Sequence, residues 1–228
     1  MSAMPSPQEA AKHVVRFGLA PRLPGLTTEE FVRRWTEHGV RTGRAGRPGR
    51  LSYVQNVPVL EHGRHLLPYP GFDVCTEATY ESMAAVTAAF ASGAPVGLHP
   101  DRYTLLDESC FCPVIARRKV LVDRVVTEDA VKLLIFYRAH PLRGPNELFD
   151  RLTKEHADIV AETAPARHEI LLASGAEMRP CDAVEIIWFA RSENALNYAR
   201  SEESYKAAIA LGGRAFGTER LIARPISG

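Results

Sequence analysis

The feature that most constrains this chain is an internal repeat, in which one order of apolar patterns occurs twice along 228 residues. A strand-like run rich in β-branched residues begins each copy, at 13–20 and at 131–138. A loop containing Pro and Gly follows each run, and then a segment with the 3.6-residue period of a helix, at 29–39 and 147–162. Two collinear copies of one order of elements predict two similar folding units in tandem.

The later elements of each copy also follow the same order. Each copy reads strand–helix–strand–strand–helix–strand, which is the ferredoxin-like split βαβ order. Such a sheet carries helices on one face only, and the second copy can cover the other face. The expected fold is therefore α+β, with two ferredoxin-like βαββαβ halves packed sheet to sheet as a pseudo-dimeric α/β barrel. The expected division is 1–122 for the N-terminal half, 123–130 for a linker and 131–228 for the C-terminal half.

Charge and apolar content narrow the possible environments and partners. The chain has 28 Lys and Arg against 27 Asp and Glu, so no global field recruits nucleic acid or an acidic membrane surface. No apolar run approaches the roughly 18–20 residues of a membrane helix, and the polar N-terminus lacks the apolar core of a signal peptide. Four scattered cysteines do not form a disulfide framework. We expect a cytoplasmic protein, either a monomeric pseudo-dimer or a homodimer, without nucleic-acid or membrane partners.

Several segments resemble one known family. The runs EEFVRRWTEHG (29–39), RLSYVQNV (50–57), FDVCTEATYESMAAV (72–86) and DESCFCPVIARRKVLV (107–122) are similar to the EthD-like family of the dimeric α/β-barrel superfamily. The resemblance persists in the second half in ELFDRLTKEHA and AVEIIWFARSENAL, although Glu-Ile-Leu-Leu replaces Tyr-Val-Gln-Asn. It implies the α/β-barrel fold, but the superfamily includes cyclases, decarboxylases, dehydratases, isomerases, cofactor-free oxygenases and haem enzymes. Fold alone therefore does not name the reaction.

Two histidines occupy matching positions on the first helix of each half. His38 and His156 each follow a phenylalanine by seven residues, Phe31 and Phe149, which places each pair on one helical face, directed toward the sheet. An imidazole there can remove and return protons near neutral pH. The alternative is a core histidine bonded to a backbone carbonyl and duplicated with the repeat. We favour His38 as the catalytic base because its surroundings are richer in polar groups.

The second strand of the first half supplies candidate partners for this base. Strand alternation places Tyr53 and Gln55 on one face and Ser52 and Asn56 on the other. A Tyr53 hydroxyl or an Asn56 amide can hold the oxygen of an enolate or phenolate as charge develops. The alternative for Tyr53 is an ordinary strand tyrosine whose hydroxyl reaches water.

Aromatic side chains are the expected walls of a substrate cleft between helices and sheet. Such a cleft suits a flat apolar molecule, although large aromatic residues also dominate protein cores. Glu185, inside an apolar strand, is expected on a wet face of the sheet rather than in a desolvated site. The expected substrate-binding residues, with Asn56, are Phe17, Trp35, Tyr80, Phe136, Tyr137 and Trp188.

Sequence signals for metals and cofactors are weak. Cys110 and Cys112 lack a second ligand pair at zinc spacing, and His62 and His65 lie in a predicted loop. Glycine-rich phosphate loops and a Gly-x-Ser-x-Gly nucleophile elbow do not occur in the sequence. We therefore expect no metal, no cofactor and chemistry by side chains alone.

The resulting hypothesis is a cofactor-independent cyclase, dehydratase or isomerase, hence a lyase or isomerase, acting on a polyketide-like or aromatic small molecule. His38 would remove a proton next to a carbonyl, and Tyr53 or Asn56 would hold the oxyanion. His156 would serve a second pocket or be structural. The alternatives are a cofactor-free monooxygenase of a phenol or anthrone, a haem protein with His156 or His168 as axial ligand, and a non-catalytic binder of a hydrophobic ligand.

Overall fold

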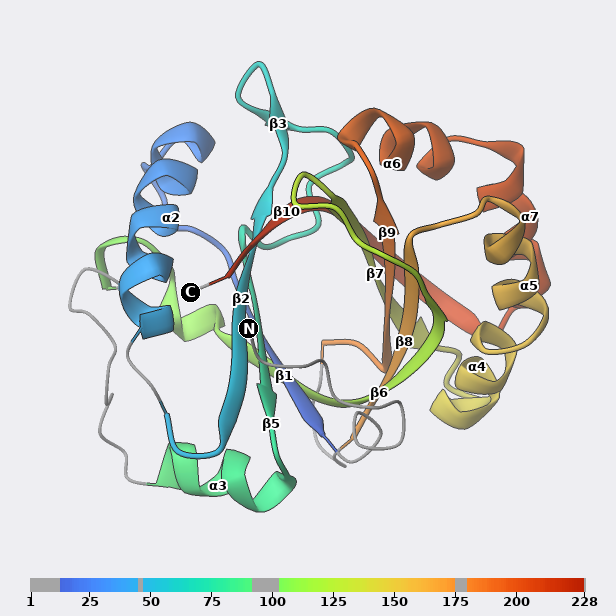
Figure 1. Cartoon of the computed structure of the whole chain (residues 1–228), viewed down its shortest axis with the longest axis horizontal. Helices are drawn as coiled ribbons and strands as arrows, with labels where there is room; N and C mark the ends of the chain where they lie inside the picture. Colours follow the sequence, from blue (N-terminus) through green and yellow to red (C-terminus); the bar gives the residue numbers. More distant parts are fainter. Residues whose placement is uncertain (1–12, 45–46, 92–102, 175–179, 228) are drawn as a thin grey trace.

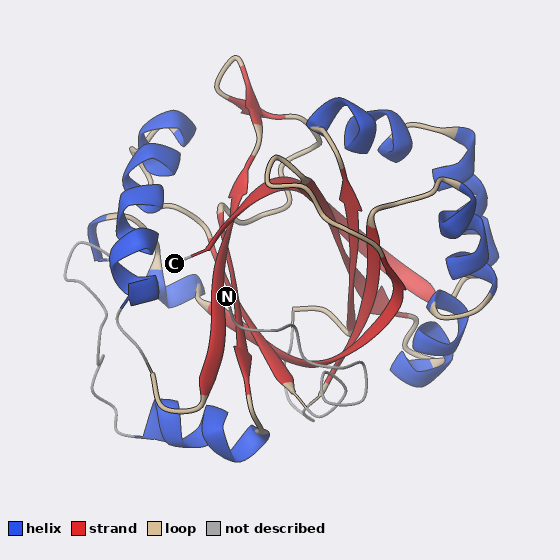
Figure 2. Cartoon of the chain, in the orientation of Figure 1, coloured by secondary structure: helices blue, strands red, loops and turns tan. Residues whose placement is uncertain are grey.

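The computed structural model describes residues 13–44, 47–91, 103–174 and 180–227. This part of the chain folds around a closed barrel of antiparallel strands, with helices packed outside it on two opposite sides (Figures 1 and 2). The barrel strands are β1 (Val14–Ala20), β2 (Arg50–Pro58), β5 (Val74–Tyr80), β6 (Cys112–Asp123), β7 (Val131–Ala139), β8 (Arg167–Ala173), β9 (Ala183–Phe189) and β10 (Ala215–Ser227). A short hairpin, β3 (Leu60–Glu61) and β4 (Arg64–His65), projects from the barrel. The expected α+β class is confirmed.

The strand order shows how the two halves form one barrel. The first half contributes the strands β6-β1-β5-β2 and the second half contributes β10-β7-β9-β8, each in the ferredoxin-like order. The barrel is closed by pairing between β2 and β10 and between β6 and β8. The halves therefore join edge to edge, and their inner faces enclose a shared core. Closure leaves no barrel strand with an unpaired edge.

The helices differ from the sequence expectation in two places. Helices α2 (Thr28–Arg44) and α3 (Met83–Ala91) cover the first half. In the second half, each of the two single helices expected from periodicity is divided into two. The first is divided into α4 (Gly144–Leu152) and α5 (Glu155–Glu162). The second is divided into α6 (Ser192–Ala199) and α7 (Glu202–Ala210). Ser201 begins α7 because its side chain accepts a hydrogen bond from the backbone N–H of Ser204. Lys154, between α4 and α5, has a non-helical backbone.

The barrel interior is apolar but contains a chain of ion pairs that crosses between the halves. The apolar part includes Phe17 and Phe136, which meet edge to face. The Lys132 ammonium lies 2.7 Å from a Glu77 carboxylate oxygen, and the Arg118 guanidinium contacts the other oxygen of Glu77. Arg118 also lies 3.4 Å from Glu169. Burial acts to raise the pKa of Glu77, but the charges of Lys132 and Arg118 outweigh it and lower that pKa to about 2. Because Lys132 and Glu169 belong to the second half, these pairs fix the register of one half against the other.

The outer face of each half-sheet packs against its own helices. In the first half, Phe31 and Trp35 of α2 lie against Ala20 and Val74. In the second half, residues of β7 and β9 pack against Leu148, Leu152 and Val160. In the described residues, no helix is both long enough and apolar enough to cross a membrane.

Candidate functional site

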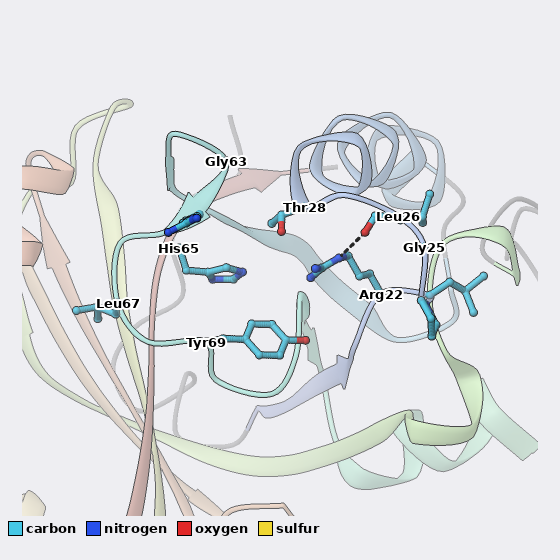
Figure 3. A pocket seen from close by; sticks show the side chains of 11 residues that line it. Arg22, Gly25, Leu26, Thr28, Gly63, His65, Leu67 and Tyr69 are labelled. Atoms are coloured by element: carbon cyan, nitrogen blue, oxygen red, sulfur yellow. Dashed lines mark hydrogen bonds between the residues drawn. The ribbon is translucent and has the colours of Figure 1, made fainter.

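A cavity of about 490 Å³ lies in the first half, outside the barrel (Figure 3). Its walls come from the loop after β1, the start of α2, the β3–β4 hairpin and the segment that follows the hairpin. Arg22, Thr28, His65 and Tyr69 contribute polar groups, and leucine side chains contribute apolar surface. Figure 3 shows Arg22 facing His65 and Tyr69 across this space. The cavity is therefore concave, largely apolar and equipped with a few convergent polar groups, as small-molecule sites are.

The local backbone explains how His65 reaches this position. The hairpin turns at His62 and Gly63, which both have positive φ, as the two central residues of a type I′ turn do. Glycine is favoured at Gly63 by its positive φ, since the nearest atoms to an added Cβ belong to the movable carboxylate end of Glu29. The tight turn places Leu60 opposite His65 and directs the imidazole toward the cavity.

A buried aspartate organises the polar groups of the cavity. Asp73, with 0% exposure, accepts hydrogen bonds from the Arg22 guanidinium at 2.7 Å, the Arg22 backbone N–H at 3.1 Å and the Tyr69 hydroxyl at 2.9 Å. Its Oδ1 also lies 3.5 Å from Nε2 of His65. Arg22 is held a second time, because its Nε donates to the Leu26 carbonyl at 2.9 Å. One carboxylate therefore orients an arginine, a tyrosine and a histidine.

The ionisation of this cluster follows from its contacts. Burial acts to raise the pKa of Asp73, but hydrogen bonds from His65, Arg22 and Tyr69 outweigh it and hold that pKa below its usual value. Burial, together with the charge of Asp73, raises the pKa of Tyr69. The carboxylate is therefore ionised and the phenol is protonated at neutral pH.

The tautomer of His65 follows from the same geometry. An ionised carboxylate only accepts hydrogen bonds, so Nε2 of His65 carries the proton that points to Asp73. In the neutral form of this ring Nδ1 has a lone pair, and no group in the described part of the chain is bonded to it. A histidine held in this way by a carboxylate can act as a base.

The predicted base, His38, lies elsewhere. It has 1% exposure, and its ring stacks on Trp35 at a centroid distance of 4.9 Å. Both residues are on α2, and the Gln55 side chain on β2 donates to the Trp35 backbone carbonyl at 2.9 Å. The expectation that His38 points toward the sheet is correct, but the structure brings it to none of the described cavities.

The predicted oxyanion partners are separated by the sheet. Asn56 faces the barrel interior, where its amide lies 3.8 Å from the Cys75 sulfur. Tyr53 lies on the other face, packed with Tyr80. Because α2 covers the outer face, His38 and Asn56 are on opposite sides of β2. The predicted joint action of His38 with Asn56 is therefore wrong, and strand alternation is the reason.

The expected aromatic walls are mainly core residues. Phe17 and Phe136 fill the barrel interior, and Trp35 and Tyr80 belong to the packing between helices and sheet. Two other aromatic residues line cavities of the second half. Tyr137 lines a cavity of about 210 Å³, and Trp188 lines a cavity of about 490 Å³.

The second predicted histidine, His156, is part of a buried polar cluster. Nε2 of His156 lies 2.8 Å from a Glu185 oxygen, and Nδ1 donates to the Ala207 carbonyl at 2.8 Å. Glu185 also accepts from His168 at 2.7 Å and from the Tyr137 hydroxyl at 2.6 Å. The expectation that Glu185 would face solvent is wrong, because it has 0% exposure beneath the helices. The backbone-carbonyl interpretation of His156 is correct, with the carboxylate as an additional partner.

One protein family matches the part of the chain that forms most of the cavity of Figure 3. Residues 23–109 match the family model described as the EthD domain. We name the cavity of Figure 3, whose walls lie mostly in the matched region, the EthD-domain cavity. Thr28, His65, Tyr69 and Asp73 lie inside the matched region, and Arg22 immediately precedes it. Among curated proteins, none matches the chain.

Solved structures resemble nearly the whole chain at low sequence identity. An anthrone oxidase-like protein superposes with a TM-score of 0.66 and 11% identity, covering 94% of this chain and 92% of that one. A proposed monooxygenase of Fusobacterium nucleatum gives 0.59 and 10%, with 94% and 93% covered. A proposed monooxygenase of Lactobacillus acidophilus NCFM gives 0.57 and 9%, with 95% and 96% covered. These likenesses show the barrel fold alone, and they extend over both halves of the chain.

The histidines of the second half do not fit the haem alternative. His156 uses both ring nitrogens, and His168 has 0% exposure with its Nε2 on Glu185. Nδ1 of His168 has no hydrogen-bond partner, but it is fully buried. An axial ligand needs a free nitrogen that faces a wide pocket. Neither histidine offers one in the described part of the chain.

Sequence reasoning missed the residues of the EthD-domain cavity. His65 and Tyr69 lie on a hairpin and a connecting segment, which have no helical or strand period that marks an inward face. The available signal was His62-Gly63, a turn pair between two short strands that predicts a hairpin. Asp73, charged and directly before the apolar run of β5, was a second signal.

Proposed function

We propose that the EthD-domain cavity is the active site of a small-molecule enzyme in which His65 removes a proton from an enolisable or phenolic substrate. The observation that supports this most directly is the contact between Nε2 of His65 and the buried Asp73. It leaves Nδ1 as the basic atom at a cavity that Arg22 and Tyr69 also line. The earlier hypothesis of histidine acid–base chemistry is retained, and the base moves from His38 to His65.

His65, Asp73 and Arg22 each have one part in the proton transfer. Nδ1 takes the proton from a carbon next to a carbonyl, or from a phenol, and the imidazole becomes an imidazolium. The electron pair of the broken bond moves to the substrate oxygen, which becomes an oxyanion. Asp73 stabilises the imidazolium, as carboxylates do in other histidine-base sites. The Arg22 guanidinium, fixed by Asp73 and by the Leu26 carbonyl, stabilises the oxyanion.

The dimensions and walls of the cavity favour one class of substrate. A volume of about 490 Å³ lies within the usual range of about 300–1,000 Å³ for pockets that hold a small organic ligand. Leu23, Leu26 and Leu67 supply apolar surface for rings, whereas Arg22, His65 and Tyr69 supply polar groups. A polyketide-like or aromatic molecule with one ionisable oxygen fits this division.

Two outcomes can follow the same first step. In a cyclase or isomerase, the carbanion attacks a second carbonyl, or it is protonated at another carbon by the His65 imidazolium. In an oxygenase, the carbanion reacts with O₂, and conversion of a CH₂ to a C=O with release of one water balances without an added reductant. The names of the structural neighbours, an anthrone oxidase-like protein and two proposed monooxygenases, favour the second outcome. Oxygen consumption with substrate present separates the two.

The experiment that tests the proposal measures proton removal directly. A panel of aryl ketones and phenols in D₂O is followed by NMR for deuterium exchange at the acidic carbon. We expect catalysed exchange in the wild type and a loss of roughly 10²–10⁴-fold in His65→Gln. His38→Gln is the matched control, since it replaces the other candidate base and should retain exchange. Exchange that survives in His65→Gln and disappears in His38→Gln would contradict the proposal.

A further inference from the structure

A smaller cavity, of about 210 Å³, lies in the second half between α7 and strands β7 and β10. At about 30 Å³ for each water in the liquid, this volume corresponds to roughly seven water molecules. Ile135, Leu211 and Phe216 give it apolar walls, and His156, Tyr198 and Arg220 give it polar ones. None of these residues takes part in the chemistry proposed for the EthD-domain cavity.

The charge of His156 is fixed by its two contacts. A backbone carbonyl only accepts, so Nδ1 donates to Ala207, and an ionised carboxylate only accepts, so Nε2 donates to Glu185. An imidazole that donates from both nitrogens is an imidazolium. Burial acts to lower the pKa of His156, but the charge and hydrogen bond of Glu185 outweigh it and raise that pKa.

The carboxylate of Glu185 is already fully committed. It accepts from His156, from His168 and from the Tyr137 hydroxyl. Its single negative charge balances the imidazolium of His156, so this pair adds no net charge to the cavity.

Arg220 is the remaining charge at the cavity. Its Nη1 donates to the Ala199 carbonyl at 3.1 Å and lies 3.5 Å from the Ser204 hydroxyl. A guanidinium has five N–H groups, and these two contacts leave several of them available. Within the described residues, no Asp or Glu forms an ion pair with Arg220. Among the residues that line the cavity, Arg220 is therefore the charge that lies outside the balanced His156–Glu185 pair.

Tyr198 provides a second polar group without a protein partner. Its side chain is nine-tenths buried, with 6% exposure, and it lines the cavity. Its ring packs on Phe189, but its hydroxyl has no hydrogen-bond partner in the described part of the chain. This hydroxyl is not one of the fully buried polar atoms without a partner, so solvent reaches it. A ligand in the cavity can replace that water as its hydrogen-bond partner.

We propose that this cavity binds a small organic carboxylate, with its carboxylate on Arg220 and the Tyr198 hydroxyl and its apolar body against Ile135 and Leu211. The planar guanidinium matches a carboxylate in a two-point contact. A neutral ligand would leave the charge of Arg220 unpaired, and a doubly charged phosphate would bring a second charge that has no partner. The small volume limits the ligand to about the size of one ring.

Benzoate is the probe that tests this site. It is titrated calorimetrically into the full chain, with benzamide as the neutral control of the same shape. We expect saturable binding of benzoate, and benzamide binding at least tenfold weaker. Arg220→Gln should weaken benzoate roughly tenfold or more, and Tyr198→Phe should weaken it several-fold, because hydrogen bonds to charged groups are the stronger class.

A matched variant separates this cavity from the EthD-domain cavity. Arg22→Gln removes the guanidinium of the other cavity and should leave this benzoate affinity unchanged. Each variant is first checked for a cooperative thermal transition, and if Arg220→Gln does not fold, Tyr198→Phe decides. Absence of saturable binding in the wild type would overturn the proposal. It would also fail if Arg22→Gln abolished binding while Tyr198→Phe and Arg220→Gln retained it.

Discussion

The two halves have one strand order but place their polar groups in different layers. Equivalent positions follow from the pairing register, since Val14 pairs with Tyr80 in the first half as Val131 pairs with Phe189 in the second. The second strands follow the same register, with Tyr53 opposite Ala78 and His168 opposite Ile187. On the sheet face beneath the helices, the matched pairs are therefore Ala20 and Tyr137, Tyr53 and His168, and Thr76 and Glu185. On the helices, His38 and His156 match by their equal spacing from Phe31 and Phe149.

The single change from Thr76 to Glu185 accounts for much of this difference. A carboxylate beneath the helices needs donors, and Tyr137, His156 and His168 supply them. With threonine at that place, His38 has no carboxylate at the equivalent position and stacks on Trp35. Outside the barrel interior, the first half instead has a buried carboxylate at Asp73, beside the EthD-domain cavity. Matching histidines thus have different roles, because the charge that determines the role has moved.

The largest expected effect is on stability, at the carboxylate that distinguishes the halves. Glu185→Gln removes the charge that pairs with His156 and should lower the free energy of unfolding by about 3–5 kcal/mol, because a buried ion pair loses one member. Thr76→Val at the matched place should cost less than about 1 kcal/mol. Urea unfolding of both variants measures the contrast. Equal effects at the two positions would show that the halves do not differ as the contacts indicate.

The sequence was sufficient for the architecture because the fold depends on patterns that repeat. Strand and helix periods, taken twice in the same order, predicted the α+β barrel, and the strand order confirms it. The breaks at Lys154 and Ser201 were missed because the apolar period continues across them. Local backbone conformation at these residues is not encoded in periodicity.

The candidate site was less predictable, because it depends on contacts between distant segments. Arg22 and Asp73 are far apart in the sequence and meet only when the loop after β1 lies beside the start of β5. The burial of Glu185 likewise depends on α5 and α7 covering β9, which a strand pattern with one charged residue does not reveal. The sequence identified the histidines, but their partners decide their chemistry.

Asp73→Asn tests whether the first-half carboxylate has the organising role assigned to it. The amide keeps the shape but loses the charge that holds Arg22, and its NH₂ group cannot accept from Tyr69. We expect a loss of about 2–3 kcal/mol in the free energy of unfolding, less than at Glu185 because Arg22 is partly exposed. Deuterium exchange should fall with it, as His65 loses its orienting partner. Stability and exchange both at wild-type levels would contradict this role.

The pH dependence of stability should differ between the two clusters. The raised pKa of His156 makes its contribution complete below its ordinary value of 6.5 and lost as pH rises through the folded-state pKa. The lowered pKa of Asp73 makes its contribution complete above its ordinary value of 3.8 and lost as pH falls. Glu185→Gln should therefore cost less at alkaline pH than near pH 6, because the contribution of the charged His156 is already lost there. The cost of Asp73→Asn in the free energy of unfolding should not change with the ionisation of His156 at alkaline pH. Urea titrations near pH 6 and at alkaline pH compare the two variants.

The smallest expected effect is that of removing the Tyr69 hydroxyl, which is compared with the Tyr137 hydroxyl of the second half. The Tyr69 and Tyr137 hydroxyls both donate to a carboxylate, Asp73 and Glu185 respectively. Tyr69 is half exposed, with 50% exposure, whereas Tyr137 has 3%. Tyr69→Phe should therefore cost about 1 kcal/mol or less, because water replaces the lost donor. Tyr137→Phe should cost about 1.5–3 kcal/mol, since the buried Glu185 keeps one lone pair without a donor. Thermal and urea unfolding of the pair measures the ratio, and a reversed order would mean that burial does not set the strength of these two bonds.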